Sequence, residues 1–206
     1  MKAWLLSVLV VGLLARSGEA SPFFLDPPKT VSLLDIPSYL GRWYQMYADL
    51  VVISTFERNA YCVTADYGLN PNKTLSVYNA NTVGSPTGKL NDIRGYATVV
   101  NQSDPGKLSV KFPAVPVPGE YWVVRLGPKE TNSVTAEPQY QYSVVTDSRR
   151  ATLFVLARDP AAFRARFQAD VLAWLKSNHF DRFYNKPLET VQTPDCQYAP
   201  NGGKKE

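Results

Sequence analysis

Between Gly41 and Arg158 the chain breaks repeatedly into short runs rich in Val, Tyr, Phe and Thr, separated by clusters of Asn, Gly, Pro, Asp and Lys. This rhythm is typical of antiparallel β-strands joined by tight turns, and the segments LNPNKT, SDPGK and TDSRR carry turn chemistry. The pattern therefore predicts an all-β fold with eight sequential strands. The predicted strands span residues 41–49, 59–68, 73–80, 91–101, 107–112, 120–126, 139–146 and 151–158.

One amphipathic helix is predicted after the last strand. Pro160 suits the first turn of a helix, and apolar residues recur at three- and four-residue spacing through about Asn178. The strand at 151–158 is largely apolar on both faces, so the helix is expected to cover it from outside. Eight strands and one external C-terminal α-helix fit an antiparallel up-and-down β-barrel, because closure of the barrel leaves no exposed sheet edge.

The two ends of the chain differ in character from its middle. Lys2, the apolar run Trp4–Ala15 and the small residues of Gly18–Ala20 are typical of a secretory signal peptide. The alternative is a buried N-terminal helix or a membrane anchor, although the apolar run is short for a bilayer. The expected organisation is a signal peptide at 1–20, an N-terminal extension at 21–34, one globular domain at 35–198 and a flexible tail at 199–206.

Secretion bears on the cysteines and on two asparagines. An oxidising compartment lets Cys62 and Cys196 pair, and the alternative is two free thiols. Asn72 and Asn101 begin N-glycosylation sequons in turn-like sequence. The net charge of +4 is modest and the Lys and Arg residues are scattered, so nucleic-acid binding is not expected.

Three motifs, in the order in which they follow one another along the chain, resemble the lipocalin family, especially its apolipoprotein D and bacterial lipocalin branch. LGRWYQMYA carries a G-x-W signature at Gly41 and Trp43, YWVV spans 121–124, and LFVLARDP places Arg158 before a proline and a helix. The resemblance covers roughly residues 35–196. It implies a lipocalin or calycin barrel that holds a fatty acid, a lysophospholipid, a retinoid, a sterol or a tetrapyrrole.

Two further features bear on this resemblance. The spacing of Cys62 and Cys196 matches a disulfide bridge of that branch. The family often has Thr-Asp-Tyr in the closed-end turn after the sixth strand, whereas here residues 126–128 read Leu-Gly-Pro and open a longer loop through Pro138. The Thr-Asp-Ser at 146–148 follows the seventh strand instead, at the open end. The closed end is therefore expected to be capped in another way.

Gly41, Trp43 and Arg158 are expected to be structural residues of the closed end rather than ligand contacts. An arginine that ends the last strand can lie over the indole of a tryptophan at the start of the first, a cation–π contact of about 0.5 to 2 kcal/mol. Its donors can also reach nearby backbone carbonyls. Gly41 would give backbone freedom, or room for close approach, where the chain enters the barrel.

Strand alternation predicts which side chains face the barrel interior. An eight-stranded barrel can hold one small ligand, but a shift of one residue in register turns a side chain outward. Each aromatic residue could equally serve ordinary core packing. Tyr140 is a further candidate for the cavity wall. The predicted ligand-binding residues are Gln45, Tyr47, Val63, Ala65, Tyr67, Tyr78, Tyr96, Phe112, Trp122, Tyr142, Phe154 and Leu156.

The segment DLVVISTFER follows the first strand at the expected open mouth. A run of four apolar residues is unusual in a loop that faces solvent. It predicts that loop 50–56 forms a lid over the ligand, contacts a membrane surface or lipoprotein, or forms a dimer surface. The alternative is that the loop folds into the mouth as part of the core. The sequence is compatible with a monomer and with a dimer. The apolar run consists of Leu50, Val51, Val52 and Ile53.

Catalysis finds little support in the sequence. The single histidine, His179, lies just beyond the helix, both cysteines are expected to be bonded, and no Gly-rich phosphate loop is present. No metal site, no cofactor and no enzymatic activity are expected. The sequence favours a secreted carrier of a small hydrophobic ligand. The alternatives are a protein-interaction or defensive sequestration role through the open-end loops and, more weakly, a lipocalin-fold enzyme acting on a lipid or carotenoid.

Overall fold

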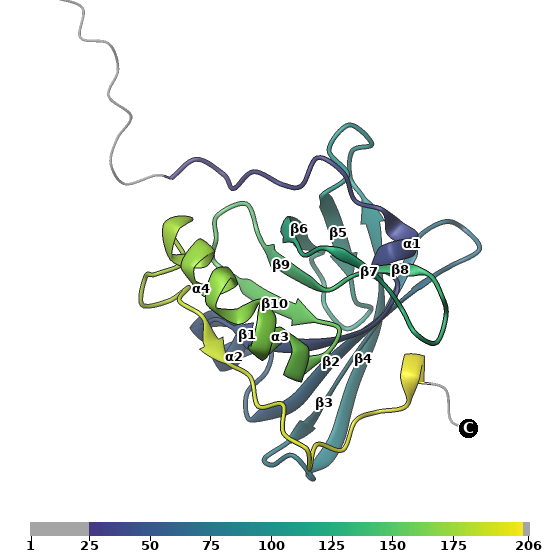
Figure 1. The fold of residues 1–206 in the computed structure, drawn as a ribbon, viewed down its shortest axis with the longest axis vertical. Helices are drawn as coiled ribbons and strands as arrows, with labels where there is room; N and C mark the ends of the chain where they lie inside the picture. The colour runs from purple at the N-terminus through teal and green to yellow at the C-terminus, as the bar shows by residue number, and fades with distance from the viewer. Residues whose placement is uncertain (1–24, 204–206) are drawn as a thin grey trace, which may run out of the picture.

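Eight antiparallel strands close into a barrel in the computed structural model, which describes residues 25–203 (Figure 1). Each strand pairs with the next along the chain, and β10 also pairs with β1, which closes the sheet. The predicted fold class is confirmed. The barrel strands are β1 (Gly41–Ala48), β2 (Ala60–Leu69), β3 (Leu75–Val83), β4 (Lys89–Val99), β5 (Lys107–Lys111), β6 (Gly119–Leu126), β9 (Tyr142–Thr146) and β10 (Leu153–Ala157).

Apolar side chains on the two faces of the barrel wall form separate clusters. In β10, Leu156 belongs to the inner cluster around Trp43, whereas its neighbour Val155 belongs to an outer cluster beneath the helices. The two-residue period of a strand explains this division. A strand that is apolar on both faces thus packs on the barrel interior and on the external helices at once.

Two helices, rather than the single predicted one, cover β10 and its neighbours from outside (Figure 1). They are α3 (Pro160–Arg166) and α4 (Gln168–Ser177), and the break falls at Phe167, whose φ of −122° lies outside the helical range. Phe163 packs into the outer cluster with residues of α4. Within the part of the chain that the structure describes, no helix has the length and apolar character needed to span a membrane.

A short helix and a hairpin cap one end of the barrel. Helix α1 (Ile36–Tyr39) lies beside β8 (Pro138–Tyr140), which pairs with β7 (Lys129–Thr131) (Figure 1). Lys129 forms an ion pair of 2.5 Å with Asp35, just before α1. The longer loop after β6 is therefore this hairpin, and with α1 it closes the end where the sequence lacks the Thr-Asp-Tyr turn.

The apolar run after β1 is a helix rather than the predicted loop. Asp49 is the N-cap residue of helix α2 (Leu50–Thr55), and its side chain accepts a hydrogen bond of 2.9 Å from the backbone N–H of Val52. Val52 is fully buried, whereas Leu50 is 42% exposed and Phe56 just after the helix is 71% exposed. The run is thus core on one side and exposed apolar surface on the other.

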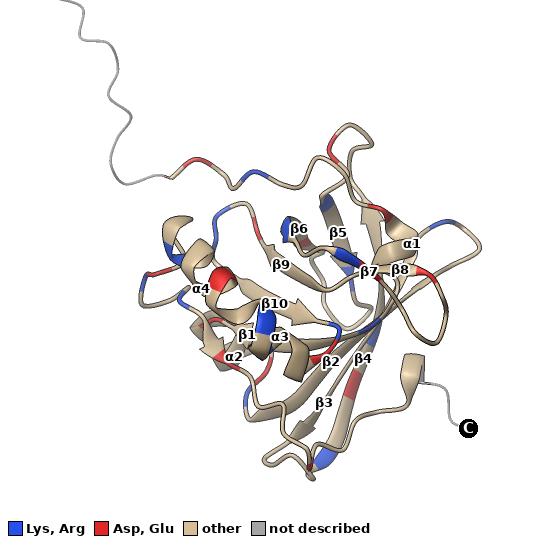
Figure 2. Ribbon diagram, in the orientation of Figure 1, with Lys and Arg blue, Asp and Glu red and all other residues tan. Residues whose placement is uncertain are grey.

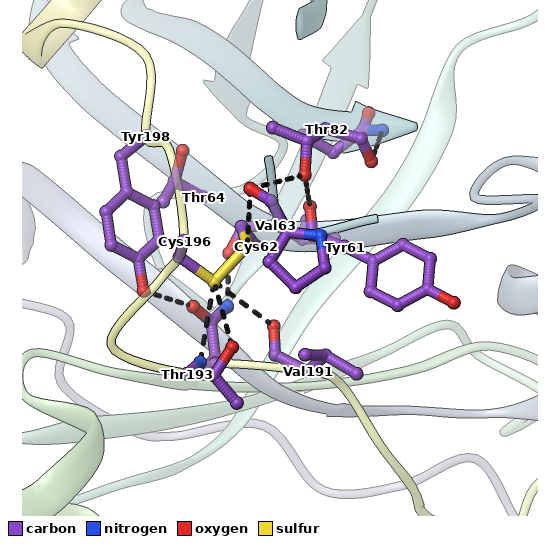
Figure 3. The surroundings of a disulfide bond; sticks show 12 residues. Tyr61, Cys62, Val63, Thr64, Thr82, Val191, Thr193, Cys196 and Tyr198 are labelled. Atoms are coloured by element: carbon purple, nitrogen blue, oxygen red, sulfur yellow. Dashed lines mark hydrogen bonds between the residues drawn. A yellow bond between two sulfur atoms is a disulfide. The ribbon is translucent and has the colours of Figure 1, made fainter. Parts of the chain in front are cut away.

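The C-terminal segment returns across the barrel and is bonded to β2. Strand β11 (Leu188–Glu189) pairs with β1, and the chain then reaches the disulfide between Cys62 and Cys196, whose Cα atoms lie 5.5 Å apart (Figure 3). Ala199, which falls in the predicted flexible tail, is buried against β3. A 3-10 turn, η1 (Asn201–Gly203), ends the described chain. The predicted signal peptide at 1–20 lies outside the described residues.

Candidate functional site

A cavity of about 540 Å³ occupies the barrel and reaches the end where β1 leads into α2. This volume lies within the range typical of small-molecule sites. The β2–β3 and β4–β5 turns lie at the opposite end, which α1 closes. Apolar side chains from strands all around the barrel form most of the wall, among them Leu75, Val77, Ile93, Leu108, Val110 and Leu156.

Part of the predicted ligand-binding set lines this cavity. The alternation of β2 and β10 was predicted in the correct register, so their selected side chains face inward. Phe112 also lies in the wall, over Gly95, where a Cβ atom would come within 2.6 Å of its ring. Gly95 thus makes room for an aromatic wall residue. The predicted residues that line the cavity are Gln45, Val63, Ala65, Tyr67, Phe112, Phe154 and Leu156.

The other predicted aromatic residues do not line the cavity. In β1 the pairing shifts between Gln45 and Tyr47, so the inward alternation ends at Gln45 and Tyr47 joins the outer cluster. In the other strands the predicted register is wrong by one residue. Tyr78 lies under the guanidinium of Arg94, and Tyr96 is 40% exposed. The residues placed wrongly on the interior face are Tyr47, Tyr78, Tyr96, Trp122 and Tyr142.

Neighbours of these residues face inward in their place. Val77, Ala97 and Tyr121 occupy the cavity wall one position away from Tyr78, Tyr96 and Trp122. Tyr140, the further candidate, packs at the capped end, where its hydroxyl accepts a hydrogen bond from the backbone N–H of Asp35. A preference for aromatic side chains selected the wrong face, since both faces of these strands carry apolar residues.

Three tyrosine hydroxyls meet at the floor of the cavity. The hydroxyl of Tyr121 lies 2.8 Å from that of Tyr39 and 2.9 Å from that of Tyr67, and Tyr39 also lies 2.8 Å from the hydroxyl of Ser143. Burial raises the pKa of Tyr39 to about 12 and raises that of Tyr67 and Tyr121 as well. The floor is therefore a network of neutral hydroxyls that are hydrogen-bonded to one another.

Beneath this floor, Arg158 braces the closed end as the sequence predicted. Its guanidinium carbon lies 3.8 Å from the ring centre of Trp43, which is fully buried. The guanidinium donates to the carbonyls of Arg42, Ser38, Leu40 and Tyr140 at 2.7 to 3.3 Å. Burial lowers the pKa of Arg158 to about 10, so it stays protonated at neutral pH.

The backbone conformation favours glycine at position 41. The φ of Gly41 is +93°, a conformation that L side chains rarely adopt. Neither Gly41, Trp43 nor Arg158 lines the cavity. Their geometry is that of a brace, which agrees with the expectation that they stabilise the closed end.

At the mouth, Glu57 places a carboxyl group in the cavity wall. The side-chain amide of Gln45 donates to Oε2 of Glu57 at 2.6 Å and to the hydroxyl of Thr190 at 3.0 Å. Burial, with a further contribution from the charge of Asp49, raises the pKa of Glu57 to about 7. Burial likewise raises the pKa of Asp49, which caps α2, to about 6. Sequence reasoning missed Glu57 because an acidic residue after a predicted loop gives no signal of enclosure.

A family model described as a lipocalin-like domain matches residues 34–182. The chain belongs to the lipocalin family. The match covers the barrel together with α3 and α4, that is, all the elements that form the cavity wall and its closed end. The family assignment therefore rests on the same residues as the candidate site.

Curated relatives place this lipocalin close to the apolipoprotein D branch. Temperature-induced lipocalin-1 of Arabidopsis thaliana is 27% identical over 184 residues, which cover 85% of this chain and 90% of the relative. Apolipoprotein D of Cavia porcellus is 36% identical over 122 residues, which cover 58% of this chain and 61% of the relative. The lipocalin thus spans less than two thirds of that apolipoprotein D.

Solved structures share the fold of this lipocalin at low sequence identity. Apocrustacyanin C1 superposes with a TM-score of 0.55 at 17% identity, and the match covers 86% of this chain and 96% of that chain. Japanin from Rhipicephalus appendiculatus, solved bound to cholesterol, superposes with a TM-score of 0.51 at 13% identity. The match covers 80% of this chain and 100% of japanin. These likenesses show the fold alone.

Charged groups are dispersed over this lipocalin. Lys and Arg positions lie on strands, helices and loops and are interspersed with Asp and Glu (Figure 2). Among residues 25–203, no group of His, Cys, Asp and Glu side chains is arranged to hold a metal ion. The polar groups in the cavity wall include the hydroxyls at the floor, the amide–carboxyl pair of Gln45 and Glu57 at the mouth, and the side chains of Asn79, Glu120, Asp147 and Arg149.

Proposed function

We propose that this lipocalin is a secreted, non-enzymatic carrier of a small hydrophobic molecule bound in the barrel cavity. The observation that carries the proposal is the cavity itself, about 540 Å³ in volume and walled mainly by apolar side chains. Apolar side chains that line an open space have no packing partner there, so an apolar ligand gains both burial and dispersion contacts. Membership of a family whose members bind small hydrophobic ligands supports the same function.

Three sequence features support secretion. The first twenty residues have the pattern of a signal peptide. Cys62 and Cys196 are joined in a disulfide, a bond that persists in oxidising compartments. The sequons at Asn72 and Asn101 lie in exposed turns, where the Oδ1 atom of each asparagine accepts from the hydroxyl two residues later. Both turns are at the closed end, so glycans there would leave the mouth free.

A binding measurement with a blocked cavity tests the carrier function. Ala97 lines the cavity, so Ala97→Phe should fill the space that a ligand needs. We expect the affinity for a neutral fluorescent hydrophobic probe to fall on the order of tenfold or more, since the lost contacts are worth at least about 1.4 kcal/mol. The probe titration is read by fluorescence, and native mass spectrometry of protein from its source should show a bound hydrophobic molecule.

Thr98→Phe provides the matched control, because Thr98 is the next residue of β4 and is absent from the cavity wall. It adds an aromatic ring on the opposite face of the same strand and should leave probe affinity unchanged. Equal affinity of Ala97→Phe and the unmodified protein would contradict binding inside the barrel. A protein that takes up no probe at all would contradict the carrier function.

A further inference from the structure

The carboxyl of Glu57 lies at the mouth of the cavity, and the carrier function alone gives it no role. The residue follows α2, and its backbone N–H donates to the carbonyl of Val52 at 3.0 Å, which fixes the chain at the mouth. Its side chain is held from the barrel wall, where Nε2 of Gln45 donates to Oε2 at 2.6 Å. Gln45 is itself 98% buried, since only 2% of its surface is exposed, so the carboxyl is anchored to a rigid strand.

The second oxygen of this carboxyl is free to receive a ligand. Among residues 25–203, no hydrogen bond reaches Oε1 of Glu57 and no Lys or Arg forms an ion pair with the residue. Glu57 is half-buried and lines the cavity, so Oε1 can be approached from the cavity. The floor differs in this respect, because its tyrosine hydroxyls already bond to one another.

The charges around the mouth are mostly negative. Asp49 acts on Glu57 from the start of α2, Asp147 and Arg149 line the same cavity from the β9–β10 loop, and Glu120 lines it from β6. The carboxylates of Asp147 and Glu120 already accept hydrogen bonds from residues of the β9–β10 loop. Arg149 is exposed and forms no ion pair with Glu57 among the described residues.

We propose that Glu57 binds the ammonium head group of an amphiphilic amine whose hydrocarbon part fills the barrel beneath it. The inference rests on the carrier function proposed above and names the class of ligand. An N–H donor of the ligand reaches Oε1 while Gln45 holds Oε2. The apolar tail then lies against Leu75, Val77 and Leu108 and ends over the self-bonded floor. A carboxylate head at the same place would meet the negative charge of Glu57.

The preference for an amine over a carboxylic acid should increase as the pH rises. Ionised Glu57 attracts an ammonium and repels a carboxylate, whereas protonated Glu57 does neither. Burial raises the pKa of Glu57 to about 7, so the charge develops as pH rises through neutrality. An alkylammonium and an alkylcarboxylate both keep their charge between about pH 5.5 and 8.5, since their pKa values resemble those of Lys and Glu side chains. A change in their relative affinity over this window therefore reports on the protein.

Three ligands of equal chain length test the proposal: dodecylamine, dodecanoic acid and dodecan-1-ol. Each competes with a neutral fluorescent probe at about pH 5.5 and about pH 8.5. We expect the affinity ratio of amine to acid to rise on the order of tenfold with pH, because a partly buried ion pair forms at the higher value. Glu57→Gln should abolish this rise, and Glu137→Gln, which removes an exposed carboxyl at the closed end, should preserve it.

The outcomes separate this inference from the carrier function. A ratio that does not change with pH, or a rise that persists in Glu57→Gln, would overturn the role of Glu57 while leaving the carrier in place. Failure of dodecylamine to displace the probe at either pH would overturn the amine proposal, whereas a protein that takes up no probe would overturn the carrier function itself. Calorimetry of the unmodified protein near pH 7 in buffers of different ionisation enthalpy gives a second readout if Glu57→Gln does not fold. Amine binding should then release protons, and binding without release would count against the proposal.

Discussion

At the scale of single residues, Arg158 holds together segments that are far apart in the chain. It is half-buried and has no carboxylate partner among the described residues, so its charge is compensated by backbone carbonyls and by the indole of Trp43. A guanidinium suits this place because its donors form a planar fork that no other side chain reproduces. The carbonyls it satisfies come from α1, β1 and the end of β8.

Replacing Arg158 should therefore cost much of the stability of the barrel. In Arg158→Met the apolar stem is kept, but the carbonyls of Arg42, Ser38 and Leu40 lose their donors in a buried place. We expect the free energy of unfolding in urea to fall by about 3 to 5 kcal/mol. Arg166→Met, which removes an exposed ion pair with Glu130, should have a much smaller effect. Equal losses for the two variants would contradict the bracing role.

At the scale of elements, the residue that caps α2 makes the stability of the protein depend on pH. Asp49 is fully buried, and one of its carboxyl oxygens, Oδ2, has no hydrogen-bond partner among the described residues. Burial raises its pKa from 3.8 to about 6 in the folded state. An acid with a raised folded-state pKa binds its proton more tightly when folded, so its contribution to stability is present at low pH and is lost as pH rises through about 6.

Asp49→Asn should gain stability relative to the unmodified protein as pH increases. The asparagine keeps the shape and the capping oxygen but never carries the charge. We expect the difference in unfolding free energy to shift in favour of the variant by up to about 3 kcal/mol between about pH 4 and pH 8. Asp159→Asn is the control, because Asp159 caps α3 in the same way but is exposed. A pH-independent difference for Asp49→Asn would contradict the assignment.

Elements were more predictable from the sequence than the directions of their side chains. Turn clusters located all eight barrel strands, since local chemistry decides where an antiparallel strand ends. The inward face was predicted correctly at Val63 and Phe154, although the pairing of β2 with β3 shifts between Tyr61 and Thr64 and β10 is apolar on both faces. Helix α2 was missed because its β-branched run has low helix propensity, and the capping by Asp49 depends on burial that no local pattern reveals. The register at Tyr47 was lost at the bulge in β1.

At the scale of the whole molecule, the barrel and the C-terminal segment are stabilised in different ways. Strand pairing between β1 and β10 closes the barrel without help from the tail. The tail is attached by the disulfide and by polar contacts, in which the amide of Gln192 donates to the carbonyls of Gln45 and Val63 at 3.0 and 2.8 Å. Figure 3 shows Val191, Thr193 and Tyr198 gathered around the disulfide.

Removal of the disulfide should therefore loosen the tail before the barrel. The bond closes a loop with a sequence separation of 134 residues, so Cys62→Ser with Cys196→Ser should lower the free energy of unfolding by up to about 5 kcal/mol on the chain-entropy model. Hydrogen exchange should accelerate first in residues 188–203, while amides of β1 and β10 stay protected. The amide of Gln45 donates to Thr190 in the tail and to Glu57 at the mouth, so loss of the tail contact should disturb the position of Glu57. Amine binding should therefore weaken more than alcohol binding. Uniformly faster exchange through β1 and β10 would show instead that barrel closure depends on the disulfide.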